Sequence, residues 1–478
     1  MFAFKSCYYW AVNKPENRNV TVFGLGRSGL ASIRYLKRLG FDIFVSDAAP
    51  QDKVPEAVRE ELKNLSVECE FGGHTEKSLA KAKFCIVSPG MAPTLPIIQS
   101  AHERSIEVIS DIELASRRAE VAKIPIVAVT GTNGKSTTTA LISHILKEAG
   151  FNAPYCGNIG VPILEVLTQA EEGNKVDFLV AEVSSYQLEY CTDFAPKVGV
   201  WLNLTPDHLD WHQGLEPYIK AKQKLFYKQG MSSFAVLNFD DPIVIGTTTM
   251  AEIFPFSQKT ELEGCIQGAY VSDNFICLRH KMQVHVLCRV DQLKIKGAHN
   301  VENALAAASC ALLLGVESKV IASALQSFTA LEHRLEFIDT IDGIEFYNDS
   351  KATNTESTIK ALEAFGEQKV ILIAGGKDKG TSLQDLAARV KKSTNAVILI
   401  GEAAERFNLN FNQAGVQNIH RVATLDAAVK LALELKSGPV LLSPACASFD
   451  MFRDYEERGH VFKNIVRAKQ KELASQAK

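Results

Sequence analysis

Residues 124–137 read IPIVAVTGTNGKST, and this stretch decides how the middle of the chain folds. A short β-branched run leads into a glycine-containing loop, and a helical pattern then extends to about Ala149. Backbone N–H groups of such a loop wrap phosphate oxygens, its lysine neutralises the outer phosphates, and its serine ligates magnesium. Val129 stands where the usual pattern has its first glycine. We therefore predict a variant triphosphate-binding loop made of Gly131, Thr132, Asn133, Gly134, Lys135, Ser136 and Thr137.

A second glycine-rich loop lies near the start of the chain. Residues 24–29 read GLGRSG; they follow the predicted strand Val20–Phe23 and begin a helix that extends to about Leu39. Glycines at these positions let a diphosphate approach the N-terminus of the helix. Asp47 follows the loop at the end of the next predicted strand. A nicotinamide-binding fold and a close-packed strand–helix turn would show the same pattern, so the loop indicates a diphosphate-containing nucleotide without selecting one.

The bulk composition excludes several classes of protein. The chain has 478 residues, which at about 100–200 residues per domain predicts two to four domains. A net charge of -3 argues against a general nucleic-acid binder. The ten cysteines form no Cys-x-x-Cys pair and lie in apolar stretches, which is typical of buried thiols in a reducing compartment. We expect no membrane span, because no apolar run reaches about 18 residues, and we interpret residues 1–18 as an extension before the first strand.

Short β-branched runs alternate with amphipathic stretches, which predicts α/β layers around parallel sheets. We expect a β-rich subregion at 232–295, a helix at Gly297–Leu314, a third unit from about Leu331 and a charged helix at the end of the chain. The predicted domains are 1–118, 119–329 and 330–478. Further strands are expected at Asp42–Ser46, Phe84–Val87, Phe178–Val183, Val198–Leu204, Val370–Ala374, Ala396–Ile400 and Val440–Ser443.

Acidic residues and a histidine follow two strands of the middle region. Glu182 ends one strand, and Asp207, His208 and Asp210 follow the other. Because ligands collect at the carboxyl ends of parallel strands, we expect these side chains to lie near the triphosphate loop. Glu182 and Ser136 suit one magnesium ion, whereas His208 is equally a ligand or a hydrogen-bonding histidine. Lys222 lies on a predicted helix, where a lysine ordinarily faces water.

Several longer motifs occur together in one order. The loop at 131–137 is followed by GNIG at 157–160, EVSSYQLE at 182–189, HN-x-x-NA at 299–304, HR at 333–334, NDSKATN at 348–354 and GGKDKG at 375–380. In these motifs the chain resembles the Mur ligases, from about Val20 to the C-terminus. The resemblance implies an α/β fold of three domains: a Rossmann-like UDP-binding domain, a P-loop ATPase-type central domain with a parallel sheet, and a Rossmann-like C-terminal domain that binds an amino acid.

The resemblance also implies roles for individual residues. Catalysis would use Lys135, His208 and Lys222, with Lys222 carbamylated. The magnesium ligands would be Ser136, Glu182, His208 and Lys222. ATP would be bound by the triphosphate loop with Asn303, Arg334 and Asp349. The UDP part would be held by Ser28, Asp47, Ser88 and Gly90, and the muramoyl part by Asn158. The amino acid would be surrounded by Lys351, Thr353, Lys379, Ser448 and Tyr455.

Residues 442–450 read LSPACASFD, which within that family looks like the D-glutamate-adding members. The implied function is ATP-dependent ligation of D-glutamate to UDP-N-acetylmuramoyl-L-alanine through an acyl phosphate, with ATP and two Mg²⁺ ions, in bacterial peptidoglycan synthesis. We expect a cytoplasmic monomer. The alternatives are another Mur-type ligase or a folylpolyglutamate synthase and, from other classes, a nicotinamide-dependent oxidoreductase or a nucleotide-gated regulatory protein.

Overall fold

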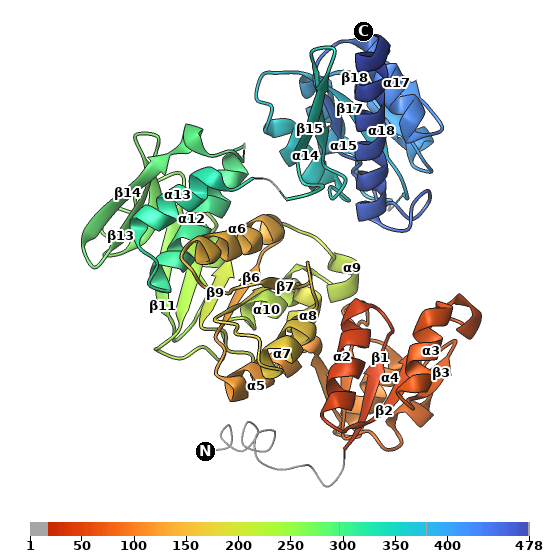
Figure 1. Cartoon of the computed structure of the whole chain (residues 1–478), viewed down its shortest axis with the longest axis vertical. Helices are drawn as coiled ribbons and strands as arrows, with labels where there is room; N and C mark the ends of the chain where they lie inside the picture. The colour runs from red at the N-terminus through yellow and green to blue at the C-terminus, as the bar shows by residue number, and fades with distance from the viewer. Residues whose placement is uncertain (1–17, 296, 330, 379, 477–478) are drawn as a thin grey trace. The chain divides into compact units, whose positions relative to one another are not determined.

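The computed structural model describes residues 18–295, 297–329, 331–378 and 380–476 (Figure 1). Its contacts divide the chain into two compact units. The first unit runs to Leu293 and includes Val301–Ser327, and the second comprises Lys294–Asn300 with everything from Phe328 onward. The first unit contains two sheets and the second contains one.

The first sheet is parallel throughout, in the order β3-β2-β1-β4-β5. Its strands are β1 Asn19–Phe23, β2 Asp42–Asp47, β3 Glu68–Phe71, β4 Phe84–Val87 and β5 Glu107–Ser110. The accompanying helices are α2 Arg27–Arg38, α3 Glu56–Asn64, α4 Pro96–Glu103 and α5 Asp111–Ala122, with short 3-10 turns at Gln51–Lys53 and Glu76–Leu79. The strand order reverses between β1 and β4, and such a switch point is where open parallel sheets bind ligands.

The second sheet has the order β14-β13-β12-β11-β10-β9-β6-β8-β7 and is parallel from β7 through β12. Its strands are β6 Ile126–Thr130, β7 Tyr155–Gly157, β8 Leu179–Glu182, β9 Val198–Trp201, β10 Phe234–Asn238, β11 Glu252–Ser257, β12 Gly268–Ser272, β13 Phe275–His280 and β14 Gln283–Arg289. The predicted β-rich subregion is present, but its strands extend this sheet instead of forming one of their own.

The helices of this part connect the strands and cover the sheet. They are α6 Lys135–Glu148, α7 Ile163–Glu171, α8 Ser185–Glu189, α9 Leu209–His212, α10 Leu215–Gln223, α11 Pro242–Ile245, α12 Ala298–Leu313 and α13 Ser318–Ser327, with a 3-10 turn at Val290–Gln292. Polar contacts join α2 and α5 to α7: Tyr35 donates to Glu171 at 2.8 Å, and Arg118 donates to both Tyr35 and Glu171. Within the first unit these contacts link the helices of the two sheets.

The sheet of the second unit has the order β15-β16-β20-β17-β18-β19, in which only β15 is antiparallel to its neighbour. Its strands are β15 Glu336–Ile341, β16 Ile344–Asn348, β17 Val370–Gly375, β18 Thr394–Ile400, β19 Ile419–Arg421 and β20 Val440–Leu442. The helices are α14 Thr355–Glu363, α15 Gln384–Ser393, α16 Ala404–Gln413, α17 Leu425–Leu435 and α18 Tyr455–Gln476.

Strand β17 shows why this sheet is covered on both faces. All six of its residues are buried, and successive side chains of a strand point to opposite faces. Leu372 packs in one core with residues of α15 and α16, whereas Ile371 and Ile373 pack in another with residues of α17 and α18. The continuous apolar run that predicted a buried parallel strand therefore supplies two cores.

The nine described cysteines are free, and seven of them are buried; Cys7 lies outside the described residues. Within the described ranges, the structure holds no helix with the length and apolar character that crossing a membrane requires. The domain limits at 118/119 and 329/330 remain predictions.

Candidate functional site

The loop between β6 and α6 is built around glycines. Gly134 has φ +83°, and a Cβ there would lie 2.3 Å from Asn303 Oδ1. Asn303 reaches the loop from α12, where its Oδ1 also accepts a hydrogen bond from Thr138 at 3.1 Å. The left-handed backbone and this close approach both require glycine. The predicted ATP residue Asn303 is thus in contact with the first turn of α6.

Asn203, which follows β9, braces the other side of the loop. Its Oδ1 accepts hydrogen bonds from the backbone N–H groups of Thr132 at 3.1 Å and Asn133 at 2.9 Å, and its Nδ2 donates to Asn133 O at 3.2 Å. The Thr132 hydroxyl lies 3.0 Å from Tyr218 OH. Sequence reasoning missed Asn203 and Tyr218, although Asn203 lies at the carboxyl end of a strand that neighbours β6.

Two ammonium groups converge on one carbonyl oxygen of the loop. Lys135 Nζ and Lys222 Nζ each donate to Gly131 O at 2.9 Å, and Lys135 Nζ also donates to Thr132 O. Lys222 comes from α10, is 1% exposed, and lies 4.7 Å from the centroid of the Tyr218 ring. Burial lowers the pKa of Lys222 well below its usual range, and the charge of Lys135 lowers it further. The carboxylates of Asp207 and Glu182 raise this pKa but do not offset the other two effects. Expected from chemistry alone to face water, Lys222 is instead buried beside the loop.

Oxygen atoms suited to a hard cation lie at the same end of the sheet. Glu182, at the end of β8, is 2% exposed, and its Oε1 accepts a hydrogen bond from Asn158 at 2.8 Å. Ser136 and Thr137 are buried in the first turn of α6. A carboxylate and a hydroxyl are ligands that magnesium prefers. The side chains present therefore fit a magnesium ion, with Asn158 orienting the carboxylate.

His208 occupies a different environment from these buried groups. It has a left-handed backbone with φ 55°, its side chain is 45% exposed, and its Nδ1 lies 3.5 Å from Asp207 Oδ1. Its ring lies 4.8 Å from that of Tyr186. The partly exposed imidazole has the chemistry of a metal ligand or of a hydrogen-bonding group.

His212 and Trp211 of α9 form the surroundings of His208 and were not predicted as site residues. His212 Nε2 lies 2.9 Å from Ser185 Oγ, and burial, with the nearby charges of His208 and Lys222, lowers its pKa to about 4. It is therefore a neutral hydrogen-bonding group near pH 7. Trp211 Nε1 donates to Gly90 O at 3.2 Å, so α9 is in contact with Gly90, one of the residues predicted to hold the UDP part.

The predicted diphosphate loop is assembled at the switch point of the first sheet. Asp47 Oδ2 accepts from Leu25 N at 2.6 Å, and its Oδ1 accepts from Ala49 N at 2.7 Å. Gly24 has φ +91°, and a Cβ there would lie 2.4 Å from Ser88 Oγ. Among the described residues, Ser88 Oγ is buried without a hydrogen-bond partner. The side chain of Ser28, in the first turn of α2, hydrogen-bonds to the buried carboxyl group of Asp111 and opposes the rise in its pKa that burial causes.

Arg334 and Asp349 lie close together in the second unit. Asp349 follows β16 and accepts hydrogen bonds from Leu335 N at 3.1 Å and Ser443 Oγ at 2.8 Å. Burial raises the pKa of Asp349 to about 6, although Ser443 and the charge of Arg334 oppose the shift. Among the described residues, Arg334 Nε is buried without a hydrogen-bond acceptor. An arginine donor with unused capacity beside a carboxyl group suits a phosphate or a hydroxyl of a nucleotide.

A buried arginine organises the predicted amino-acid residues. Arg458 of α18 donates to Ser350 Oγ at 2.9 Å and Ser350 O at 2.8 Å, and also to Cys446 O at 3.2 Å. These bonds join the segment that carries Lys351 and Thr353 to the segment that carries Ser448. Lys351 Nζ lies 5.6 Å from the centroid of the Tyr455 ring. Lys379 lies outside the described residues, and its neighbour Lys377 pairs with Glu402 at 2.7 Å.

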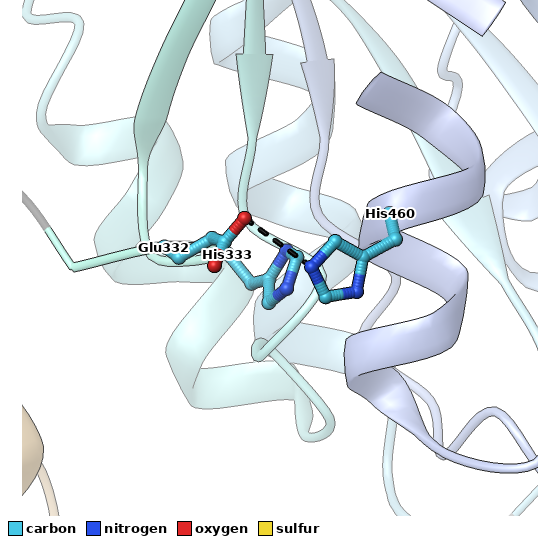
Figure 2. A group of neighbouring side chains, drawn as sticks. All are labelled: Glu332, His333 and His460. Atoms are coloured by element: carbon cyan, nitrogen blue, oxygen red, sulfur yellow. Dashed lines mark ion pairs between the residues drawn. The ribbon is translucent and has the colours of Figure 1, made fainter. Parts of the chain in front are cut away.

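Glu332, His333 and His460 of the second unit also have metal-ligand chemistry, with ligand atoms within 4.8 Å of one another (Figure 2). Asn348 Nδ2 donates to His333 Nδ1 at 2.8 Å, so a neutral His333 carries its proton on Nε2 and offers no lone pair there. The ammonium group of Lys463 lies 2.5 Å from Glu332 Oε1. The group is therefore an ion-pair and hydrogen-bond cluster, not a metal centre.

Three family models match the chain. The Mur ligase MurD-like N-terminal domain matches residues 18–110, the Mur ligase middle domain matches 129–311, and the Mur ligase glutamate ligase domain matches 333–446. These spans contain the diphosphate loop, the triphosphate loop, and the Arg334–Asp349 pair, respectively.

Relatives of known name match nearly the whole chain. Proteins named UDP-N-acetylmuramoylalanine--D-glutamate ligase from Pelotomaculum thermopropionicum and Geobacter metallireducens are both 42% identical, covering 94% and 95% of this chain and 97% and 98% of their own. The structure of UDP-N-acetylmuramate-alanine ligase from Thermotoga maritima is similar in fold, with a TM-score of 0.59 at 18% identity, over 94% of this chain and 99% of that one. A pseudomurein peptide ligase from Methanothermus fervidus aligns with a TM-score of 0.55 at 20% identity, over 95% and 100%.

Proposed function

The chain belongs to the Mur ligase family, and from this premise we propose that it joins D-glutamate to UDP-N-acetylmuramoyl-L-alanine in an ATP-dependent reaction of peptidoglycan precursor synthesis. The observation that carries the proposal is the identity of about 40% with ligases named for this reaction, over 94% of this chain and 98% of the relative from Thermoanaerobacter pseudethanolicus. The segment LSPACASFD at 442–450 supports D-glutamate as the amino acid.

The chemistry explains why ATP is needed. A carboxylate does not react with an amine near neutral pH, because its leaving group is poor. Transfer of the γ-phosphoryl group to the alanyl carboxylate forms an acyl phosphate and ADP. The neutral amine of D-glutamate then attacks the acyl carbon, the amide bond forms, and phosphate leaves. The residues must therefore hold phosphates, orient two substrates and take up a proton from the amine.

The triphosphate loop performs the first of these tasks. Its backbone N–H groups bind phosphate oxygens, and Lys135 stabilises the charge on the transferring phosphoryl group. Lys135 already lies within 2.9 Å of Gly131 O. Asn303, Arg334 and Asp349 complete the ATP site in this proposal, and His208 is the candidate base for the amine.

Magnesium would be held by Ser136, Glu182, His208 and a carbamylated Lys222, with two ions expected. Bound there, it supplies Lewis-acid stabilisation of phosphate oxygens. Carbamylation joins the neutral Lys222 amine to the carbon of CO₂ with loss of one proton, which replaces a cation by an anionic oxygen donor. The burial of Lys222 and the lowered pKa of its amine support that reaction.

The remaining assignments follow the three predicted domains, 1–118, 119–329 and 330–478. Ser28, Asp47, Ser88 and Gly90 hold the UDP part, and Asn158 contacts the muramoyl part. Lys351, Thr353, Lys379, Ser448 and Tyr455 bind D-glutamate, whose two carboxylates require cationic partners. We place the enzyme, as a monomer, in the bacterial cytoplasm, where its nucleotide substrates are found.

The decisive experiment is an amino-acid panel. ADP formation by the purified protein is measured with UDP-N-acetylmuramoyl-L-alanine and, in turn, D-glutamate, L-glutamate, L-lysine and diaminopimelate. Turnover with D-glutamate alone supports the proposal, and preferred turnover of another amino acid overturns it. Lys135→Ala should abolish ADP formation while UDP-substrate binding persists, and Lys147→Ala, at the far end of α6, is the matched control.

A further inference from the structure

His74 lies at the edge of the first sheet where the diphosphate loop is built. Its ring packs edge-to-face against Phe23, the last residue of β1, with centroids 5.3 Å apart. The same segment crosses the end of β2, because Gly72 N donates to Asp47 O at 3.0 Å. The imidazole therefore lies over the carboxyl ends of β1 and β2, beside Asp47 and the loop that begins at Gly24.

A chain of hydrogen bonds determines which nitrogen of His74 carries a proton. The buried Ser46 hydroxyl lies 2.6 Å from Glu70 Oε1 and 2.7 Å from His74 Nδ1, while Gly73 O is at the outer limit of 3.5 Å. A hydroxyl has one hydrogen to donate, and an ionised carboxylate can only accept. Ser46 must then donate to Glu70 and accept from His74 Nδ1–H.

The ionisation states agree with this geometry. Burial raises the pKa of Glu70, but hydrogen bonds from Ser46 and from the hydroxyl and backbone of Thr75 outweigh it and hold the pKa below its usual value. Burial lowers the pKa of His74 despite the neighbouring carboxylates Glu70 and Asp47. An imidazole that is neutral and protonated on Nδ1 has a free lone pair on Nε2. Among the described residues, Nε2 has no hydrogen-bond partner.

We propose that His74 Nε2 accepts a hydrogen bond from the uridine part of the UDP-linked substrate, and that Ser46 and Glu70 hold the ring in the state that can accept it. The inference rests on the proposed function and adds a specificity residue to it. Asp47, the expected partner of a ribose hydroxyl in such folds, already accepts a backbone bond on each oxygen. Two uridine donors fit the acceptor: the imide N3–H of the base and a ribose hydroxyl.

Two substitutions of His74 separate the acceptor from the packing. In His74→Asn the side-chain NH₂ can still donate to Ser46, but no acceptor reaches the position of Nε2. In His74→Gln an oxygen reaches that position. His102→Asn, at an exposed histidine of α4 in the same domain, is the matched control. Thermal melting verifies that each variant folds.

The measurement is calorimetric binding of UDP and of three analogues, N3-methyl-UDP, 2′-deoxy-UDP and 3′-deoxy-UDP, to the full chain. We expect His74→Asn to weaken UDP binding by about three- to tenfold, the worth of one hydrogen bond, with His74→Gln weakened less and His102→Asn unchanged. One of the three analogues lacks the group that donates to His74 Nε2. Wild type and His74→Asn should bind that analogue equally, which identifies whether the donor belongs to the base or to the ribose.

The inference would be overturned if His74→Asn bound UDP and all three analogues more weakly than wild type by the same factor, because the loss would then be structural. Equal UDP binding by wild type and His74→Asn would also overturn it while leaving the proposed function intact. Failure of the wild-type protein to bind UDP would instead remove the proposed UDP site and this inference together.

Discussion

Lys135 and Lys222 lie at the same distance from Gly131 O but differ in burial, and this difference separates their roles. Lys135 is the loop lysine, placed to meet phosphates, whereas Lys222 is enclosed and is disfavoured as a cation by burial and by Lys135. A buried amine held partly neutral can react with CO₂, and the product is an anion that relieves the repulsion between the two side chains.

Removal of the Lys222 side chain should therefore be rescued chemically. We expect Lys222→Ala to lower turnover by at least about 10–100-fold, because losing a metal ligand costs no less than losing a group that orients one. Added acetate or formate should restore part of the activity, because a small carboxylate can occupy the vacated space. Lys220→Ala, on the exposed side of the same helix and paired with Glu216, should change neither turnover nor its response to acetate. Absence of any rescue in a folded Lys222→Ala protein would contradict the carbamate.

Asp349 makes the stability of the second unit depend on pH. Burial raises the folded pKa of Asp349 to about 6 from its ordinary value of 3.8, so the fold favours its neutral form. That stabilisation is complete below the unfolded value and is lost as pH rises through about 6. The side chain in Asp349→Asn cannot ionise, so it makes no pH-dependent contribution of this kind to the free energy of unfolding.

Urea unfolding at several pH values measures the effect. Relative to wild type, Asp349→Asn should gain about 1 kcal/mol of unfolding free energy between pH 5 and pH 7.5. Asp342→Asn, at an exposed turn residue that pairs with Lys436, is the control and should show no such trend. A constant difference between Asp349→Asn and wild type across this range would argue that Asp349 is ionised throughout.

At the scale of elements, the segment after β9 supports the loop after β6 through Asn203. Asn203→Asp keeps an oxygen for Thr132 N and Asn133 N but replaces the donor to Asn133 O by an anionic oxygen. Repulsion with that carbonyl and with bound phosphates should weaken ATP binding about tenfold, with melting temperature little changed. Calorimetric titration with Mg·ATP measures this, and Asn174→Asp, at an exposed position beyond α7, is the control. Unchanged affinity would show that Asn203 does not support the nucleotide site.

The strands and loops with local signals were predictable from the sequence. Val20–Phe23 with its glycine loop, and the run before Gly131, each combine a buried strand with a loop that only a few folds use, and the structure has β1 and β6 there. Asn203 carries no motif, because its importance arises from the pairing of β9 with β6, which are far apart in sequence. Strand order is a non-local property that hydrophobic periodicity does not encode.

Arg458 illustrates a second limit. An arginine on a charged terminal helix is ordinarily exposed, yet here it is buried because carbonyl oxygens of Cys446 and Ser350 satisfy its donors. The hairpin β15–β16 was also missed; β15 is only partly buried, whereas four of the five residues of β16 are buried. The sites for ATP and the amino acid were predicted through motifs, whereas the side chains that hold those motifs in place could be identified only in the structure.

At the scale of the whole molecule, the division into two compact units predicts how the protein unfolds. Each unit has its own apolar cores. Independent cores can melt independently, so a thermal scan should contain two transitions. The proposed UDP site belongs entirely to the first unit, and Arg458 belongs entirely to the second.

A ligand and a substitution should therefore act on different transitions. UDP at about 100 times its Kd should stabilise the first unit by about 2.7 kcal/mol and raise only that transition. Arg458→Ala should lower only the other transition, because the two segments of the second unit that contain Ser350 and Cys446 lose their shared donor. Arg453→Ala, at a neighbouring arginine that is 82% exposed, should leave both transitions in place. Differential scanning calorimetry of the full chain tests both effects. A single transition that responds to UDP and to Arg458→Ala alike would show that the two units unfold as one cooperative body.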